Sequence, residues 1–334
     1  MSKLLEIKDL CVEFGPAGHA IKVLHNVNLS IAHGEAVGLV GESGSGKSIT
    51  SLSVLRLLSE PPGRITSGEI VFEGRNLLDL PRSDMPAIRG KEIAMIFQEP
   101  MSSLNPVMTI GAQLSEAIML HSEHNESQRK NRILELLKLV GIPEPEARLK
   151  QYPHEFSGGM RQRVMIAMSL ACDPKLLIAD EPTTALDVTI QAQVLDLLRQ
   201  LRERVGMAVL LISHDLGVVA DVCDRVVVMY AGHVVEDADI ASLFESPKHP
   251  YTRGLLSAVP SLSDTRERLY QIPGSVPSPG SVKRGCPFYD RCDLRKDICH
   301  NEMPQLHAHS STHKAACWVT SSDAEAVSES GVTT

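Results

Sequence analysis

The segment Gly41-Glu42-Ser43-Gly44-Ser45-Gly46-Lys47-Ser48 is the strongest indication of the fold. The apolar run 36–40 before it is typical of a fully buried strand, and residues 48–58 after it carry apolar side chains at helical spacing. Glycines allow backbone N–H groups to converge on phosphate oxygens at the N-terminus of a helix, where aligned peptide dipoles add positive potential. The order of strand, glycine loop and helix therefore indicates a P-loop in an α/β fold.

The residue types of this loop predict a site for a nucleoside triphosphate and Mg2+. Lys47 reaches the β- and γ-phosphates, and the Ser48 hydroxyl joins the Mg2+ shell. A chance glycine-rich turn is the alternative, but the flanking strand and helix argue against it. The candidate nucleotide-binding residues of the loop are Gly41, Ser43, Gly44, Ser45, Gly46, Lys47, Ser48 and Ile49.

A second buried strand ends in two carboxylates. The apolar run 176–179 leads directly into Asp180 and Glu181, and a doubly wound sheet is expected to bring that strand end beside the P-loop. We expect Asp180 to hold Mg2+ through water, and Glu181 to polarise the attacking water as a catalytic residue. Two solvated acids that cap a strand are the alternative interpretation.

Two further polar residues follow predicted strands. Gln98 ends the strand 93–97, where it can contact Mg2+ or its water and relay nucleotide state to the helices beyond. His214 stands two residues after the strand 208–212, where it can hydrogen-bond the γ-phosphate and orient the catalytic Glu181. Each residue alone is more often a polar strand-end group, but the order of the motifs favours functional roles.

Composition narrows the class of protein. The 334 residues carry a formal net charge of -8 and no block of Lys or Arg, which argues against a nucleic-acid binder. No apolar stretch approaches the roughly 20 residues that a membrane-spanning helix needs. The first residues also lack the apolar core of a secretory signal. We therefore expect a cytosolic chain that does not itself cross a bilayer.

The chain is expected to divide into three parts. Residues 1–243 alternate strands and helices, apart from a helical insert at about 99–157 with helical periodicity at 108–120 and 128–139. Residues 244–318 form an extension, and its stretch 260–285 has the Pro and Gly content of a linker. Residues 319–334 carry no core pattern, so we expect a disordered tail.

The motifs resemble those of the ATP-binding-cassette family over about residues 4–240. In family order they are the P-loop, Gln98, Ser157-Gly158-Gly159-Met160-Arg161-Gln162, Asp180-Glu181, Asp187 and His214. The resemblance implies a P-loop NTPase nucleotide-binding domain with a RecA-like core, an antiparallel β subdomain and a helical subdomain. It also implies ATP hydrolysis by a dimer that encloses two ATP molecules.

The same resemblance implies that some residues of this chain act on the nucleotide bound by the partner cassette. Ser157, Gly158 and Gly159 would contact the nucleotide that the partner cassette binds, because a helix N-terminus suits a γ-phosphate. Asp187 would shape the site across the dimer. An aromatic residue near the N-terminus usually stacks on adenine in this family, and Phe14 is the candidate. Packing of Phe14 in the core is the alternative.

Residues 97–106 and 249–256, together with a cysteine-containing extension, resemble ATPase subunits of bacterial oligopeptide, dipeptide and nickel importers. This branch implies a peripheral subunit at the cytoplasmic face of the inner membrane that energises two transmembrane permease subunits fed by a solute-binding protein. It favours a second, different cassette over a homodimer. A soluble family ATPase that acts on nucleic acid or ribosomes is the alternative, which a single P-loop and a short insert disfavour.

The extension contains four cysteines, Cys286, Cys292, Cys299 and Cys317. Four thiolates can close a four-coordinate site in a reducing compartment. A structural zinc site more often shows paired C-x2-C motifs, which are absent here. The family resemblance favours a 4Fe-4S cluster held by the four cysteines, with zinc and unligated thiols as the alternatives. The extension is therefore expected to be a small, irregular, metal-binding module.

Overall fold

The computed structural model describes residues 2–16, 18–98, 104–184, 187–259 and 270–321. The chain forms two compact units. The first unit consists of Met1–Leu4, Ile31–Ala36 and Glu73–Ile212. The second unit consists of Leu5–Ser30, Val37–Phe72 and Ser213–Thr334.

The first unit contains three parallel strands, β6 (Ile93–Ile96), β7 (Leu176–Asp180) and β8 (Ala208–Ser213). Their register pairs Ile96 with Ala179, and Asp180 with Ile212. Every residue of β7 and β8 is buried, as continuous apolar strands are when both faces of a parallel sheet are covered. The carboxylate pair therefore stands at the end of a fixed strand.

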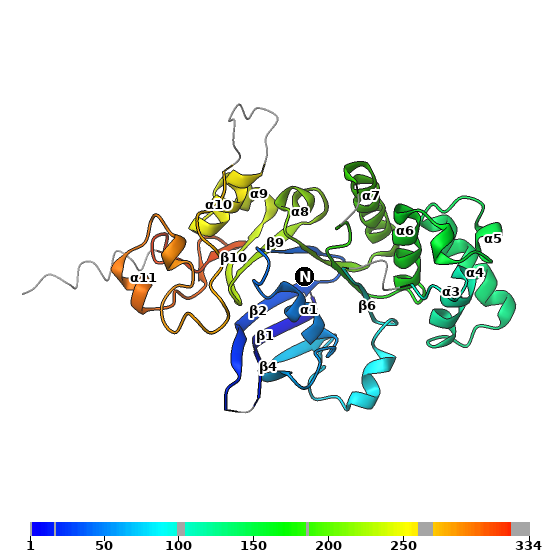
Figure 1. The fold of residues 1–334 in the computed structure, drawn as a ribbon, viewed down its shortest axis with the longest axis horizontal. Helices are drawn as coiled ribbons and strands as arrows, with labels where there is room; N and C mark the ends of the chain where they lie inside the picture. The colour runs from blue at the N-terminus through cyan, green and yellow to red at the C-terminus, as the bar shows by residue number, and fades with distance from the viewer. Residues whose placement is uncertain (1, 17, 99–103, 185–186, 260–269, 322–334) are drawn as a thin grey trace, which may run out of the picture. The chain divides into compact units, whose positions relative to one another are not determined.

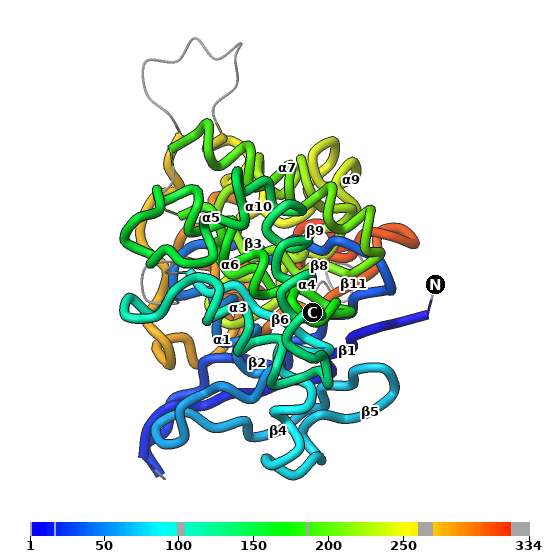
Figure 2. The backbone as a smooth tube through the Cα atoms, turned by 90° about the vertical axis from the view of Figure 1, so that its right-hand side faces the viewer, coloured from blue at the N-terminus to red at the C-terminus, as the bar shows by residue number. Residues whose placement is uncertain are grey.

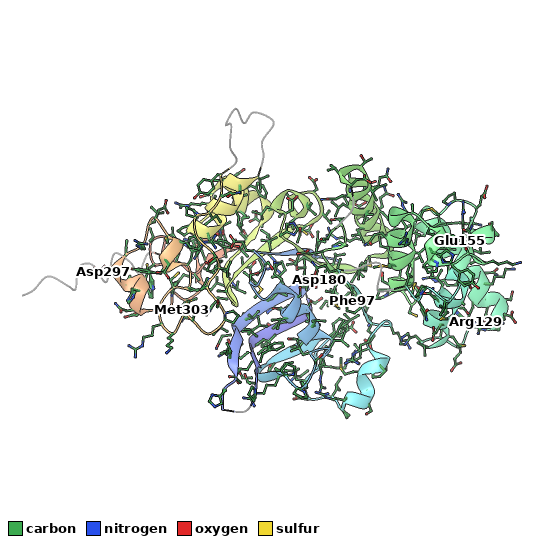
Figure 3. The ribbon with its side chains drawn as sticks, in the orientation of Figure 1. Phe97, Arg129, Glu155, Asp180, Asp297 and Met303 are labelled. Carbon is green, nitrogen blue, oxygen red and sulfur yellow. The ribbon has the colours of Figure 1, made fainter. Side chains whose placement is uncertain are left out.

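Helices dominate the rest of the first unit (Figure 1). The helix α3 (Ile110–Met119) packs against α4 (Glu126–Leu139), and both contact α6 (Gly158–Ser169). The remaining elements are β5 (Arg75–Asn76), η1 (Arg82–Ala87), α5 (Pro145–Arg148), η2 (Pro153–Glu155) and α7 (Val188–Val205). Figure 3 labels Arg129 and Glu155, whose side chains lie on this helical part.

Side-chain caps fix where two helices of the first unit begin. The Thr109 hydroxyl accepts a hydrogen bond from Ala112 N at 3.3 Å and caps α3. At the start of α4, Asn125 and Gln128 exchange the two bonds of a capping box. These caps satisfy N–H groups that have no partner inside the helix, so polar residues in the sequence set the two helix starts.

The second unit contains an antiparallel sheet in the order β2-β1-β4, formed by β2 (Ile21–Ala32), β1 (Lys3–Phe14) and β4 (Gly63–Phe72). Figure 2 shows these three strands side by side. Separately, β3 (Ala36–Val40) runs parallel to β9 (Arg225–Tyr230), and β10 (His233–Asp239) is antiparallel to β9. The helices of this unit are α1 (Lys47–Val54), α8 (Leu216–Val222), α9 (Ile240–Glu245), α10 (Pro250–Ala258), η3 (Tyr289–Arg291) and α11 (Asp297–Asn301).

The C-terminal extension continues the sheet of β9 and β10. Its strand β12 (His313–Ala315) pairs antiparallel with β10, and β11 (His307–Ala308) pairs with β12. Glu236 of β10 is fully buried and accepts hydrogen bonds from Lys248 N at 2.6 Å and His249 N at 2.9 Å. His313 Nε2 lies 2.7 Å from the same carboxylate. The extension, expected to be irregular, is thus anchored through regular strand pairing.

Among the described residues, no helix has the length and apolar character needed to span a membrane.

Candidate active site

The predicted P-loop forms a compact turn that opens α1. Lys47 is the first residue of that helix and is only 6% exposed. Its Nζ donates to Gly41 O at 2.6 Å, to Glu42 O at 3.1 Å and to Ser45 Oγ at 3.4 Å. The ammonium group is thereby held against its own loop, and the first turn of α1 contains no acidic residue to oppose an anion. This arrangement suits a bound phosphate chain.

Glycine is required where the loop begins. Gly41 has a φ of +154°, and a Cβ at this position would meet Met229 O at 2.2 Å. Gly46 has a φ of +103° and ends the loop in a left-handed conformation, which side chains rarely adopt. The glycines predicted from the motif therefore have a steric cause in the structure.

The structure brings the predicted residues Gln98 and Glu181 together. Gln98 Nε2 donates to Glu181 Oε2 at 2.8 Å. Their strands are neighbours, because Ile96 of β6 pairs with Ala179 of β7. Figure 3 labels Phe97 and Asp180, the residues that follow those two positions at this edge of the sheet. Asp180 is 5% exposed.

Glu181 is held in a strained conformation. It has a φ of +46°, a region that costs a non-glycine residue about 1–2 kcal/mol, and its N–H donates to Ile212 O at 3.0 Å. Thr184 Oγ donates to Glu181 Oε2 at 2.9 Å, so Gln98 and Thr184 bind the same carboxylate oxygen. Thr184 was not predicted as a site residue, although its position three residues after Glu181 suits a turn.

The predicted signature residues form the start of α6. Ser157 caps this helix and accepts a hydrogen bond from Met160 N at 3.3 Å. Ser157 and Gly158 are exposed, and a Cβ on Gly158 would meet nothing within 4 Å. A Cβ on Gly159 would instead meet Ile190 at 2.9 Å. The start of α6 is therefore exposed at Ser157 and Gly158 and packs more closely at Gly159.

Asp187, also predicted as a site residue, caps α7. Its side chain accepts a hydrogen bond from Ile190 N at 2.9 Å. The preceding residues 185 and 186 lie outside the described residues.

His214 and Phe14 both belong to the second unit. His214 is exposed and directly follows the last residue of β8. Phe14 is the last residue of β1 and is partly buried. A Cβ on Gly63 would lie 3.0 Å from two Phe14 ring atoms, so the ring packs against that glycine.

The C-terminal extension contacts the P-loop, which was not predicted. Arg291 is 7% exposed, and its two terminal nitrogens lie 2.8 and 3.1 Å from the carboxylate oxygens of Glu42. Glu42 N donates to the hydroxyl of Tyr251, a fully buried residue of α10 whose pKa is raised by burial. A bidentate arginine–carboxylate pair fixes orientation as well as charge. The P-loop is therefore held by residues more than 200 positions further along the chain.

The four cysteines of the extension share one small cavity. Cys286, Cys292, Cys299 and Cys317 all line a space of about 10 Å³. Burial, together with the charges of the neighbouring thiolates, raises the pKa of Cys286 to about 12. A cation would offset this cost of ionising the thiols, so the donor set fits a metal by its chemistry. Within the described ranges, however, no three His, Cys, Asp or Glu side chains have the arrangement of a metal site.

The architecture belongs to a known class. The chain matches the dimeric structure of an ATP-binding cassette in a post-hydrolysis state bound to ADP and Pi, with a TM-score of 0.63 and 29% identity, over 71% of this chain and 98% of that one. It also matches part of an ABC transporter complex from Clostridium perfringens, with a TM-score of 0.63 and 26% identity, over 74% and 92% of the two chains. Fold and site define an ATP-hydrolysing cassette.

Sequence comparisons specify the family. The ABC transporter family model matches residues 24–184, and the model for the oligopeptide/dipeptide transporter C-terminal region matches residues 235–299. The chain belongs to the ABC transporter family as an ATP-binding subunit. It is 52% identical to a probable peptide ABC transporter ATP-binding protein of Sinorhizobium fredii, over 94% of each chain. It is 48% identical to the oligopeptide transport ATP-binding protein OppD of Bacillus subtilis, over 98% of this chain and 92% of that one.

These findings confirm the predicted family, the α/β cassette fold and the ATPase activity. The roles of individual site residues stay predictions.

Proposed function

We propose that the chain is the ATP-hydrolysing subunit of a bacterial importer for dipeptides, oligopeptides or a related small solute. The observation that carries this proposal is similarity along nearly the whole chain to ATP-binding proteins of peptide transport, including the match to the peptide-type C-terminal region. Closure of two cassettes on ATP would drive the transporter through its cycle.

In the proposed reaction, the P-loop residues bind the triphosphate and Glu181 polarises the attacking water. Lys47 neutralises phosphate charge at the N-terminus of α1. Ser48 and Asp180 would hold Mg2+, with Gln98 near it, and Mg2+ would neutralise charge on the phosphate oxygens. Gln98 and Thr184 orient the Glu181 carboxylate by donating to its Oε2. His214 is proposed to hydrogen-bond the γ-phosphate.

A second cassette completes each proposed site. The exposed start of α6, with Ser157, Gly158 and Gly159, would contact the nucleotide of the partner, and Asp187 would shape the opposite site. The matched cassette structure is a dimer, which supports this arrangement. The resemblance to ATPase subunits of peptide importers favours a second cassette of different sequence over a second copy of this chain.

The helical part of the first unit is proposed to receive the permease subunits. The apolar side chains of Val107, Met119 and Leu120 there are exposed, at 79%, 57% and 69%. Exposed apolar side chains suit a protein contact. The chain would then act at the cytoplasmic face of the inner membrane, held there by two permeases that receive solute from a binding protein.

The four extension cysteines are proposed to hold a 4Fe-4S cluster, which ATP hydrolysis does not require and which would stabilise the extension. Their shared cavity and the raised pKa of Cys286 support this assignment. Visible absorption and iron content of anaerobically purified protein test it. Zinc without visible absorption would contradict it, and Cys292→Ser should abolish the absorption of a genuine cluster.

The importer proposal is tested by affinity purification of the tagged chain from its native cells. We expect two permease subunits and a second cassette to co-purify, and peptide uptake to fail when Lys47 is replaced by alanine. A soluble role on nucleic acid or ribosomes predicts ribosomal proteins or DNA in the same preparation and unchanged uptake.

A further inference from the structure

Glu42 is the one acidic residue of the P-loop, residues 41–48, and it directly follows Gly41. A loop that receives a triphosphate gains from positive charge, whereas an unpaired carboxylate beside the phosphates opposes their binding. Apart from Lys47, the other side chains of the loop are uncharged. The chain therefore places a negative charge where its ligand is also negative, and that charge needs a counterion.

Arg291 of the C-terminal extension binds both oxygens of this carboxylate. Its Nη1 lies 2.8 Å from Glu42 Oε2, and its Nη2 lies 3.1 Å from Glu42 Oε1. The side chain of Arg291 is 7% exposed and that of Glu42 is 28% exposed, so solvent screens the pair only in part. Because both oxygens are paired, neither is left to face an anion in the loop.

The Arg291 guanidinium is also held by groups other than the carboxylate. Its Nε donates to Pro273 O at 2.9 Å, and its Nη2 donates to Ile272 O at 3.2 Å. Its central carbon lies 5.7 Å from the ring centroid of Tyr230 and 5.8 Å from that of Phe288, within the range of cation–π attraction. The guanidinium is therefore positioned independently of the charge on the P-loop.

An aromatic cluster holds the extension against the P-loop. The Phe288 ring is buried and lies edge-on to Tyr230, with ring centroids 5.2 Å apart, and Phe288 O accepts a hydrogen bond from Arg291 N at 3.1 Å. Tyr251 packs against both rings, and its hydroxyl accepts a hydrogen bond from Glu42 N at 2.8 Å. The extension thus contacts both the backbone and the side chain of the P-loop acid.

We propose that Arg291 is a positioning residue for ATP binding, because it neutralises the Glu42 carboxylate and holds both of its oxygens. Arg291 acts through Glu42 and not by contact with the reacting atoms. The proposal rests on the proposed binding of ATP by the P-loop, and it makes the C-terminal extension part of the nucleotide-binding machinery.

This role differs from that of an ordinary structural ion pair. In a structural pair, the loss of either partner is harmful. Here the loss of the guanidinium harms ATP binding, the loss of the carboxylate does not, and the loss of both charges restores binding.

Calorimetric binding of ATP with Mg2+ to the full chain tests the proposal. We expect Arg291→Gln to weaken ATP binding about tenfold, because an unpaired carboxylate then lies beside the triphosphate. Glu42→Gln removes the acid, so its ATP affinity should stay within about twofold of that of the unaltered chain. The double variant with both substitutions should recover most of the affinity that Arg291→Gln loses.

The double variant also separates charge neutralisation from damage to the extension. If Arg291→Gln weakened ATP binding only by loosening the extension, Glu42→Gln would not reverse the loss, because this second change restores no contact.

ATP turnover by the assembled transporter is the second measurement. In Arg291→Gln the KM for ATP should rise about tenfold while kcat stays that of the unaltered chain, because the lost interaction acts on bound ATP and on the transition state alike. A fall in kcat without a change in KM would contradict the proposal.

Arg295→Gln is the matched control. Arg295 is an exposed residue of the same extension, and its guanidinium contacts the Tyr289 ring and Asp290 O. The variant loses the same charge as Arg291→Gln without touching Glu42. It should bind ATP as the unaltered chain does.

Either of two results would overturn the proposal alone: unchanged ATP affinity in Arg291→Gln, or a double variant that binds ATP as weakly as Arg291→Gln does. If Arg291→Gln does not fold, the single variant Glu42→Gln still decides, because a loss of about tenfold or more in its ATP affinity would contradict the proposal. Absence of ATP binding by the unaltered chain would instead overturn the ATP-binding role of the P-loop and the proposal with it.

Discussion

At the scale of single residues, Glu181 combines a strained backbone with a fixed side chain. Its φ of +46° is stabilised by a backbone hydrogen bond to Ile212, and two donors bind one oxygen of its carboxylate. Strain of this kind persists where the surroundings determine the conformation, and it gathers at functional sites. The geometry therefore favours a catalytic carboxylate over a solvated acid that merely caps a strand.

Glu181→Gln should separate binding from hydrolysis. The amide keeps the shape of the side chain but cannot accept a proton, so we expect ATP affinity to stay unchanged and ATP turnover to fall about 100- to 10,000-fold. Phosphate release by the assembled transporter measures the effect. Asp196→Asn, which removes an exposed carboxylate paired with Arg199 on α7, is the control. Normal turnover in Glu181→Gln would exclude Glu181 as the catalytic base.

His233 should make stability depend on pH. Its pKa is about 3 in the folded chain against an ordinary value of 6.5. Between these values the unfolded chain binds a proton that the folded chain does not, so stability falls as the pH drops below 6.5 and is fully present above it. The slope is at most about 1.4 kcal/mol per pH unit for one proton.

Urea denaturation at about pH 7.5 and about pH 5 measures this dependence. The loss of unfolding free energy between the two pH values should be smaller in His233→Gln than in the unaltered chain. His124→Gln, at an exposed position of the first unit, should keep the original difference. An equal loss in His233→Gln would contradict the assignment.

The sequence motifs predicted part of the candidate site. The motif order placed Gln98 and Glu181 in one constellation, and their side chains meet in the structure. The Arg291–Glu42 pair could not be predicted, because its members stand 249 positions apart and no local pattern links an arginine in the extension to a P-loop glutamate. Local chemistry is visible in a sequence, whereas contacts between distant segments depend on the fold.

At the scale of elements, two helices start with the same kind of cap but in different surroundings. Ser157 caps α6 and Thr109 caps α3, each accepting a backbone hydrogen bond at 3.3 Å. Two glycines follow Ser157, and the first of them, Gly158, is exposed. Of these two helix starts, that of α6 is the one proposed to contact the nucleotide of a partner cassette.

Replacing each cap by alanine should distinguish structure from function. Ser157→Ala and Thr109→Ala should each cost about 1 kcal/mol of stability, as lost caps do. Only Ser157→Ala should lower ATP hydrolysis by the assembled transporter, by about 100-fold if its hydroxyl contacts the γ-phosphate. Equal turnover in the two variants would show that Ser157 serves the helix alone.

The pattern of apolar residues predicted the longer strands and helices, but it did not predict the shortest strand. The predicted strands 176–179 and 208–212 correspond to β7 and β8, because continuous apolar runs are typical of covered parallel strands. The predicted helices 108–120 and 128–139 correspond to α3 and α4. The strand β12 has three residues, too few to show alternation, so its pairing with β10 could not be foreseen.

At the scale of the whole molecule, the extension depends on one buried carboxylate. Glu236 is fully buried, and its oxygens bind two backbone N–H groups and lie beside His313. A buried charge is tolerated when it is paired and hydrogen-bonded in this way. Glu236 thus connects the start of α10 and the strand β12 to the sheet of the second unit.

Glu236→Ala should loosen the extension. The change leaves the N–H groups of Lys248 and His249 without their acceptor, and we expect a loss of about 3–5 kcal/mol, as when one partner of a buried pair is removed. Limited proteolysis should then cut within residues 244–318 faster than in the unaltered chain. The control variant Glu245→Ala, at an exposed position of α9, should be cleaved at the same rate as the unaltered chain. Identical cleavage of both variants would contradict the anchoring role.

The pairing of Glu42 with Arg291 also has a consequence for how the chain is made. A ribosome releases the N-terminal segment first, and Arg291 is synthesised 249 residues after Glu42. A nascent or prematurely terminated chain therefore carries its glycine loop without the guanidinium that anchors it. Complete and incomplete chains therefore differ at the P-loop, because only a complete chain contains the Arg291 contact to Glu42. The P-loop can reach its final geometry only after nearly the whole chain has been translated.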